Sequence, residues 1–188
     1  LTMPREAIQV VPKTSRYFST LDATTGYWQI PLDRASQDLT TFITPKGRYK
    51  YLRNPMGLSS AQDEYGRRGD LAMEGLVGVS KVVDDILVFS DTAQEHLRRV
   101  VCVLDRCREH GITLHPKKFF FGQDDVEYVG YRVNRQGYRA DPGKVAAIRD
   151  FPTPSNIHEL RSFFGLVNQL AEFTTDIARA AEPLRPLL

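Results

Sequence analysis

The chain has 188 residues, of which 41% are hydrophobic and 26% are charged, and this composition predicts one ordinary globular domain or two small ones. A net charge of +2 indicates no particular affinity for nucleic acid, and no uninterrupted apolar run is long enough to span a membrane. We see no signal peptide, so we expect a chain that is not secreted and whose two cysteines, Cys102 and Cys107, are reduced thiols in the core.

The first predicted elements are rich in β-formers. Residues 17–32, YFSTLDATTGYWQIPL, predict two strands joined by a tight turn, with Asp22 at the end of the first strand. Residues 40–52 predict a hairpin that turns at Pro45–Gly47. Residues 59–76 predict a helix.

The strongest helix prediction covers residues 91–110, where Thr92 and Glu95 form a capping box. We expect its apolar stripe to consist of Leu97, Val100, Val101 and Leu104. Two short β segments are predicted next, around residues 119–121 and 126–133.

The pattern becomes helical after residue 133. A short helix is predicted at 141–150, and a longer one follows Asn156, which forms a capping box with Glu159. The apolar stripe of the longer helix is expected to be Ile157, Leu160, Phe163, Phe164, Val167 and Leu170. A third helical stretch is predicted up to the C-terminus. We therefore divide the chain into a mixed β–α region, residues 1–133, and a helical region, residues 134–188.

The most hydrophobic run of the chain, KVVDDILVFS at residues 81–90, contains the adjacent carboxylates Asp84 and Asp85. Most such pairs lie in turns and have no function. On a straight strand the two side chains would face opposite ways, so they converge only if a hairpin tip divides the run into KVV and ILVFS. Asp22, at the end of its own strand, is the natural third member of such a group.

Grouped carboxylates need a cation. Two carboxylates about 4 Å apart repel by about 4 kcal/mol at an effective dielectric constant near 20, so the site would hold a proton or bind a cation. A set of carboxylates without His or Cys is a hard oxygen site, which favours magnesium or manganese over zinc. Two such ions about 3.5–4 Å apart can activate an attacking hydroxyl and stabilise a leaving phosphate.

Five segments now carry a family resemblance: FSTLDATTGYWQIPL, PMGLSSAQDEY, VVDDILVFS, VEYVGYRV and GYRADPGKVAAIRDFPTPSNIHELRSFFGLVNQLAEF. In this order they resemble the reverse transcriptases of gypsy-type LTR retrotransposons, from about Arg5 onward. The resemblance implies an α+β right-hand polymerase. Residues 1–133 would hold the palm, an antiparallel sheet packed on helices, with part of the fingers, and residues 134–188 would hold a small helical thumb.

The resemblance implies that Asp22 is the first catalytic aspartate and that Asp84 and Asp85 are the pair of the Tyr-x-Asp-Asp turn, although position 82 is Val in place of Tyr. All three would be ligands of two Mg²⁺ ions, with Mn²⁺ as an alternative. We expect Asp22 and Asp84 to bridge the ions and Asp85 to act less directly. The implied reaction is RNA-directed DNA synthesis from deoxynucleoside triphosphates on a primed RNA or DNA template.

Other matching positions would contact the nucleotide. The resemblance places Tyr27 under the incoming sugar, where it would reject a 2′-hydroxyl; the alternative is a core tyrosine. Met56 and Gly57 match a loop that contacts the nucleotide, or form an ordinary strand-to-helix turn. Lys117 and Lys118 match a position near the triphosphate, or lie in a solvated loop.

A second set would contact the primer and template. Tyr128, Val129, Gly130 and Tyr131 match the hairpin that grips the primer end, with a plain edge strand as the alternative.

On the predicted long helix, Arg161, Gly165 and Gln169 fall at i, i+4 and i+8, on the face opposite the apolar stripe. A polar face with a glycine at its centre fits a nucleic-acid minor groove. Tight packing of another helix against Gly165 explains the glycine equally well.

The resemblance also implies the setting of the chain. We expect a segment of a Pol polyprotein that includes RNase H and integrase, in cytoplasmic virus-like particles. Only 21 residues precede Asp22, whereas the family's basic fingers strands lie further upstream, so we expect the isolated chain to be weak or inactive.

Two other functions compete with a polymerase. The chain could be a decayed or domesticated remnant that binds nucleic acid without catalysis, or a protein in which the same carboxylates hold a structural metal such as calcium. The tripeptide Arg68–Gly69–Asp70 spells an integrin-binding motif, which we interpret as chance within a helix.

Overall fold

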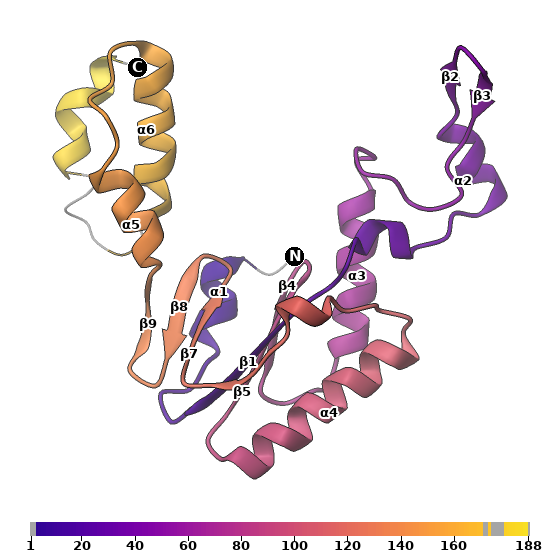
Figure 1. The fold of residues 1–188 in the computed structure, drawn as a ribbon, viewed down its shortest axis with the longest axis horizontal. Helices are drawn as coiled ribbons and strands as arrows, with labels where there is room; N and C mark the ends of the chain where they lie inside the picture. Colours follow the sequence, from indigo (N-terminus) through magenta and orange to yellow (C-terminus); the bar gives the residue numbers. More distant parts are fainter. Residues whose placement is uncertain (1–2, 171–172, 174–178, 188) are drawn as a thin grey trace.

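The computed structural model describes residues 3–170, 173 and 179–187. Its central feature is an antiparallel sheet with the strand order β4-β5-β1-β6 (Figure 1). A second sheet has the order β7-β8-β9, and β2 pairs with β3 alone. The strands are β1 (Tyr17–Asp22), β2 (Phe42–Thr44), β3 (Gly47–Tyr49), β4 (Val79–Val82), β5 (Asp85–Ser90), β6 (Phe120–Gln123), β7 (Asp125–Tyr128), β8 (Tyr131–Asn134) and β9 (Gly137–Ala140).

Helices cover the sheet and continue beyond it. The described α-helices are α1 (Pro4–Gln9), α2 (Arg34–Leu39), α3 (Ala61–Met73), α4 (Ala93–Glu109), α5 (Pro142–Arg149) and α6 (Ile157–Leu170). Short 3-10 turns are found at η1 (Gly26–Gln29), η2 (Pro116–Lys118) and η3 (Glu182–Leu187). No helix in the described ranges is both long and apolar enough to cross a membrane.

The central sheet is buried on both faces. Along β5, Ile86 and Val88 join the core formed with α3 and α4, whereas Leu87 and Phe89 join the core formed with α1, β7 and β8. Because successive side chains of a strand point to opposite faces, a strand that is buried on both faces has no polar alternation. This explains why residues 86–89 form a continuous apolar run.

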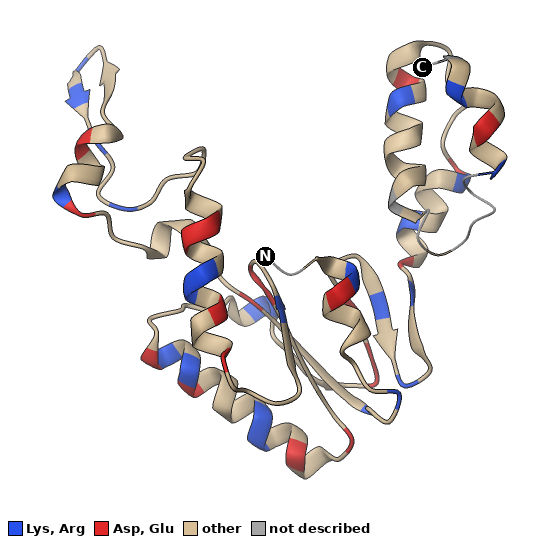
Figure 2. Cartoon of the chain, turned by 180° about the vertical axis from the view of Figure 1, so that it is seen from behind, with Lys and Arg blue, Asp and Glu red and all other residues tan. Residues whose placement is uncertain are grey.

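The molecule has the outline of a U in Figure 1. The β2–β3 hairpin with α2 stands at one end, α5 and α6 stand at the other, and the central sheet lies at the base between them. Acidic and basic residues are interleaved along α3 and α4 (Figure 2), so neither helix carries charges of a single sign. β8 runs across the boundary that we drew at residue 133, and our division of the chain into palm and thumb stays a prediction.

Several predicted elements are confirmed with shorter bounds. The hairpin within residues 40–52 corresponds to β2 and β3, and the helix predicted at 59–76 is α3. Thr92 caps α4 by accepting a hydrogen bond from the backbone N–H of Glu95 at 3.3 Å. Asn156 likewise accepts a bond from the backbone N–H of Glu159 before α6.

Other expectations were wrong. The second strand expected within residues 17–32 is the 3-10 turn η1, because the chain reverses at Thr25, which has a φ of +47°. Among the described α-helices and strands, α1, α2 and β9 were not predicted. The third helical stretch lies partly outside the described residues. Cys107 is buried as expected, whereas Cys102 is an exposed free thiol.

The stripe that we expected on α4 was also wrong, except at Val100, which is buried. Leu97, Val101 and Leu104 are exposed, and the buried side chains of α4 are His96, Val100, Val103 and Cys107. A histidine belongs to this core because the sheet supplies partners for both ring nitrogens, the hydroxyls of Ser19 at 2.6 Å and Ser90 at 3.0 Å.

Candidate active site

The strands β4 and β5 form a hairpin whose loop consists of Val83 and Asp84, since Val82 pairs with Asp85. Val83 has a φ of +50°, a left-handed conformation that β-branched residues rarely adopt. The backbone N–H of Ala23 donates to the carbonyl of Asp84 at 3.1 Å, which ties the loop to the end of β1. A hairpin tip therefore divides the apolar run, as expected, but one residue earlier than expected: Val83 lies in the loop and Asp85 already belongs to β5.

Asp22 ends β1 and lies directly opposite Asp85 in the antiparallel register. Residues in such positions have Cα atoms about 4.5–5.5 Å apart, within reach of each other's side chains. Asp84 lies next to this pair in the loop, close enough for the charge of Asp22 to act on its carboxyl group. The structure brings the three residues to one end of the sheet, and their roles as catalytic groups and metal ligands stay predictions.

The local environment disfavours the charged forms of two of these carboxyls. Burial raises the pKa of Asp85, and the charges of Asp22 and Asp84 raise it further. Burial also raises the pKa of Asp84, and the charge of Asp22 raises it further. Within the described structure, Oδ1 of Asp84 is buried and has no hydrogen-bond partner. The site thus holds more negative charge than its own donors satisfy.

One cation already lies on the group. Nζ of Lys118 donates to Oδ2 of Asp22 at 2.9 Å, and this bond raises the pKa of the Lys118 ammonium. The Lys118 side chain is 57% exposed, so it can leave the carboxylate without disturbing the core. Of the two lysines that we singled out in this loop, the structure places Lys118 at the carboxylates.

The donor set fits a hard divalent cation. It consists of carboxylate oxygens, and the unpartnered Oδ1 of Asp84 is a buried oxygen that a cation would satisfy. As the side chains stand, no cluster of three or more Asp, Glu, His or Cys residues in the described part of the chain is arranged as a ready set of ligands. An ion bound there would need these carboxylates to rotate, and it would compete with Lys118 for Asp22.

Two residues that the sequence analysis did not single out shape the site, Gly26 and Tyr65. A Cβ atom at Gly26 would lie 2.6 Å from Oδ1 of Asp84 and would collide with the Tyr65 ring. Burial raises the pKa of the Tyr65 phenol, and the charge of Asp84 raises it further. Gly26 could have been found, because a glycine in a β-rich segment often marks a close approach of other groups. Tyr65 gave no such signal, since a buried aromatic residue on a helix looks like ordinary core.

A cavity of about 320 Å³ opens beside the carboxylates, and its lining includes Asp22, Asp85, Lys118 and Glu127. Glu127 was not singled out either, and its charge contributes to the raised pKa of Asp85. Residues 128–130 complete this wall of the cavity, so the hairpin that we assigned to the primer end lies next to the carboxylates.

That hairpin turns at Val129 and Gly130, because Tyr128 pairs with Tyr131. Both loop residues have positive φ values, +45° and +86°, as a type I′ turn requires. The two tyrosines are buried in the core. The loop also lines a second cavity of about 370 Å³, together with Lys144 and other residues from α1 and the helical region 134–188. The loop residues line both cavities, whereas Tyr128 lines only the first and Tyr131 only the second.

The residues assigned to the nucleotide lie in two places. Tyr27, in η1, is half-buried and makes an edge-to-face contact with Tyr65, with 5.5 Å between the ring centroids. It thus lies one aromatic ring away from Asp84 and packs partly against the core, so both of our interpretations of it stay open. Met56 is 67% exposed, and the adjacent Gly57 has a φ of +96°.

On α6, Phe164, Val167 and Leu170 are buried, whereas Arg161 and Gly165 are exposed on another face. A Cβ atom at Gly165 would meet no described atom within 4 Å. The described residues therefore give no support to helix packing at this glycine, and the minor-groove role stays a prediction. The side chain of Gln169 lies outside what the structure describes.

Comparison with known proteins identifies the family. The family described as "Reverse transcriptase (RNA-dependent DNA polymerase)" matches residues 4–133, more than half of the chain. The chain belongs to the reverse transcriptase family. It is 32% identical over 176 residues to the retrovirus-related Pol polyprotein from transposon gypsy of Drosophila melanogaster. That match covers 93% of this chain and 17% of the polyprotein, so the chain spans a small part of its relative's length.

Solved structures agree in fold. The foamy viral protease-reverse transcriptase dRH in complex with double-stranded DNA matches the whole chain and 33% of that protein, with a TM-score of 0.93 and 24% identity. The foamy viral protease-reverse transcriptase in complex with an RNA/DNA hybrid matches 92% of the chain and 24% of that protein, with a TM-score of 0.82 and 23% identity. The palm-like reverse transcriptase fold and the resemblance to gypsy-type elements are thereby confirmed. Membership in this family implies a divalent metal cofactor in general.

Proposed function

We propose that this chain is the polymerase segment of a retrotransposon Pol polyprotein and that it extends a DNA primer on an RNA template with Mg²⁺. The observation that carries this proposal is the register of the sheet, in which Asp22 lies opposite Asp85 with Asp84 in the adjacent loop. Family membership supports the reaction class. The resemblance in fold to reverse transcriptases bound to double-stranded DNA and to an RNA/DNA hybrid supports a primed template as the partner.

Asp22, Asp84 and Asp85 would hold the metal, because Asp22 and Asp85 line the cavity opposite each other and Asp84 lies in the adjacent loop. A divalent ion bound there lowers the pKa of an attacking hydroxyl and neutralises charge on the transferred phosphate. The raised pKa values of Asp84 and Asp85 mean that the folded chain favours the presence of positive charge at this point. Lys118, which lies on Asp22 at 2.9 Å, would then be released towards the triphosphate as a phosphate-binding cation.

The surrounding residues would orient the substrates. Tyr27 would lie against the sugar of the deoxynucleoside triphosphate and exclude a 2′-hydroxyl, and Met56 with Gly57 would contact the nucleotide from the exposed loop. Loop residues 129–130 would position the primer end beside the carboxylates, which share a cavity with that loop. The exposed Arg161–Gly165 face of α6 would follow the template–primer duplex, with Arg161 towards phosphate.

Primer extension under single-turnover conditions tests the proposal, with the chain in excess over an RNA template annealed to a labelled DNA primer. An excess of protein makes slow incorporation measurable. We expect Mg²⁺-dependent extension that falls by at least about 100-fold in Asp22→Asn and in Asp84→Asn, because these changes remove electrostatic stabilisation of the transition state. Extension that persists in both variants would contradict the assignment. Duplex binding without extension would favour a non-catalytic remnant.

A further inference from the structure

Lys81, in β4, is a charged residue that the fold almost completely buries. Its side chain is 7% exposed, and a buried ammonium group is costly unless it is paired. Nζ of Lys81 lies 3.0 Å from Oδ1 of Asp70 on α3. The same atom donates to the backbone carbonyl of Val83 at 3.3 Å. One ammonium group therefore connects α3 to the loop that carries Asp84.

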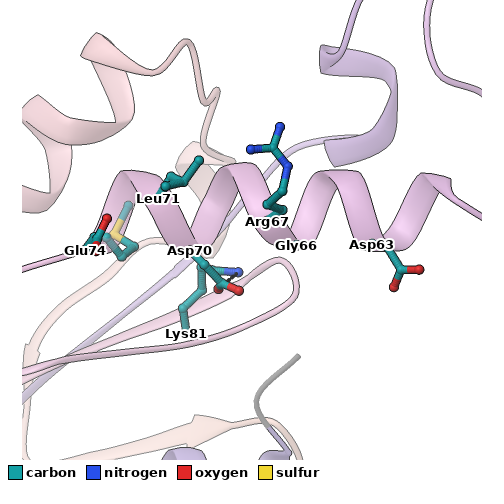
Figure 3. A pocket seen from close by; sticks show the side chains of 8 residues that line it. Asp63, Gly66, Arg67, Asp70, Leu71, Glu74 and Lys81 are labelled. Atoms are coloured by element: carbon teal, nitrogen blue, oxygen red, sulfur yellow. Dashed lines mark ion pairs between the residues drawn. The ribbon is translucent and has the colours of Figure 1, made fainter.

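The surface of α3 is shaped to admit this side chain. A Cβ atom at Gly69 would lie 2.9 Å from Nζ of Lys81 and 3.0 Å from its Cε. Glycine inside a helix costs about 1 kcal/mol relative to alanine, so its presence at this position calls for a reason. The passage of Lys81 supplies one. Figure 3 shows Asp70 and Lys81 meeting at this point of the helix, with Asp63 further along the same helix.

The loop that Lys81 contacts contains a residue in an unfavourable backbone conformation. Val83 has a φ of +50°, and a left-handed β-branched residue persists only where its surroundings hold it. Two hydrogen bonds act on the loop carbonyls. Lys81 donates to the carbonyl of Val83, and the backbone N–H of Ala23 donates to the carbonyl of Asp84. Loss of the first bond leaves the second to hold the loop.

We propose that Lys81, paired with Asp70 and accommodated by Gly69, is a positioning residue that keeps the Val83–Asp84 loop in the conformation that presents Asp84 to the active site. This role also gives the Gly69–Asp70 part of the integrin-like tripeptide a structural meaning. The consequence for catalysis rests on the proposed polymerase function, whereas the effect on the loop does not.

Amide hydrogen exchange tests the effect on the loop without any need for activity. The reporter is the amide of Ala23, which is bonded to the carbonyl of Asp84, and the amide of Leu87 within β5 serves as an internal reference for global opening. We expect Lys81→Met and Gly69→Ala to raise the exchange rate of the Ala23 amide about tenfold while that of Leu87 stays unchanged. Asp63→Asn removes a charge from the same helix without touching Lys81 and should change neither rate.

Unchanged exchange of the Ala23 amide in Lys81→Met and Gly69→Ala would overturn the inference. Should either variant fail to fold, Asp70→Asn takes its place, because the Asp70 side chain is 54% exposed and its replacement leaves the core intact. We expect about threefold faster exchange of the Ala23 amide in that variant, and an unchanged rate would again overturn the inference.

Kinetics separate positioning from general stability. Lys81 lines a cavity of about 660 Å³ beside α3 that includes none of the three aspartates of the candidate active site, so Lys81→Met should lower kcat about tenfold and leave the KM for the primer–template unchanged. Asp63→Asn should leave both constants unchanged. A normal kcat in Lys81→Met would overturn the positioning role. If the unsubstituted chain shows no extension that depends on Asp84, the proposed function fails, and the exchange measurement still decides whether Lys81 holds the loop.

Discussion

Burial and two neighbouring carboxylates all raise the pKa of Asp85. The pKa of this carboxyl is raised first by burial and then by the charges of Asp22 and Asp84, with the charge of Lys118 opposing them. The folded chain therefore binds a proton at Asp85 more readily than the unfolded chain does. Ionised carboxyls gathered in this way lower the free energy of unfolding, and they favour the binding of a proton or a cation.

This imbalance leads to a dependence of stability on pH. Because the folded pKa of Asp85 lies above its ordinary value of 3.8, the free energy of unfolding should fall as the pH rises from the ordinary to the folded value, and stay lower above it. We expect Asp85→Asn to remove this contribution. In urea denaturation with EDTA present, the variant should be more stable than the unsubstituted chain at pH 7, with a smaller difference near pH 4. An equal difference at both pH values would show that the carboxyl is not perturbed.

Sugar selection provides a second prediction at the residue scale. Tyr27 packs edge-to-face on Tyr65 and so has a fixed position close to Asp84. If its ring lies under the incoming sugar, Tyr27→Ala should lower the preference for deoxynucleotides over ribonucleotides about tenfold or more, measured as the ratio of the two kcat/KM values. Tyr17→Ala offers a control, since Tyr17 lies at the other end of β1. If Tyr27→Ala leaves the preference for deoxynucleotides unchanged, Tyr27 is a core residue and does not select the sugar.

Part of the site could be predicted from single residues. Asp84 and Asp85 stood out because carboxylates conflict with an apolar run, and Asp22 stood out at a strand end. Tyr65 and Glu127 were missed, because a buried tyrosine and an exposed glutamate are common residues whose importance comes only from their position. The pairing of Lys118 with Asp22 joins residues 96 positions apart, which no local pattern reports.

At the scale of elements, α4 shows where periodicity is insufficient. Two adjacent apolar rows on this helix both follow helical spacing, and only one of them faces the sheet. The decisive residue is His96, whose ring is satisfied by Ser19 and Ser90 from the neighbouring strands. The sequence analysis did not include this histidine in the apolar stripe, and the expected stripe was displaced around the helix.

The two rows can be compared with a matched pair of substitutions. Val103 is fully buried, whereas Val101 is 45% exposed on the same helix. Val103→Ala should lower the free energy of unfolding by roughly 2 kcal/mol, because it removes buried methyl groups and leaves a cavity. Val101→Ala should change it by less than about 0.5 kcal/mol. Chemical denaturation measures both values, and a larger effect at Val101 would restore the stripe expected from the sequence.

Strand predictions were correct only where the local sequence pattern agreed with the tertiary contacts. The β4–β5 hairpin was expected because two aspartates interrupt an apolar run, and the register of the sheet confirms the interruption. The second strand expected after Asp22 was wrong, because its β-formers are used in η1, where a turn at Thr25 directs Tyr27 towards Tyr65. Tertiary contacts thus overrode local β-propensity.

In the whole molecule, the β2–β3 hairpin and helix α6 stand at opposite ends of the central sheet (Figure 1). The family resemblance supplied this architecture, because composition and periodicity alone predicted no more than a mixed region followed by helices. Of the second sheet, β9 was missed for a related reason: this short strand has no buried residue and therefore no apolar alternation.

If α6 lies along a duplex, the salt dependence of binding should report it. Arg161 is exposed on α6, and its loss should weaken binding to a primer–template and reduce the slope of log affinity against log salt concentration by about 1. Arg98→Ala is a matched control, since Arg98 is also exposed but lies on α4 beneath the sheet. Fluorescence anisotropy at several salt concentrations measures both, and equal slopes for the two variants would contradict a contact between Arg161 and phosphate.

The central claim is that Asp22, Asp84 and Asp85 together hold a divalent ion at the end of the palm sheet. Anomalous diffraction from crystals grown with Mn²⁺ tests it most directly. We expect an anomalous peak about 2–2.5 Å from carboxylate oxygens of Asp22 and at least one of the other two residues, with Lys118 displaced from Asp22. Mn²⁺ that binds elsewhere while Lys118 stays on Asp22 would contradict the claim.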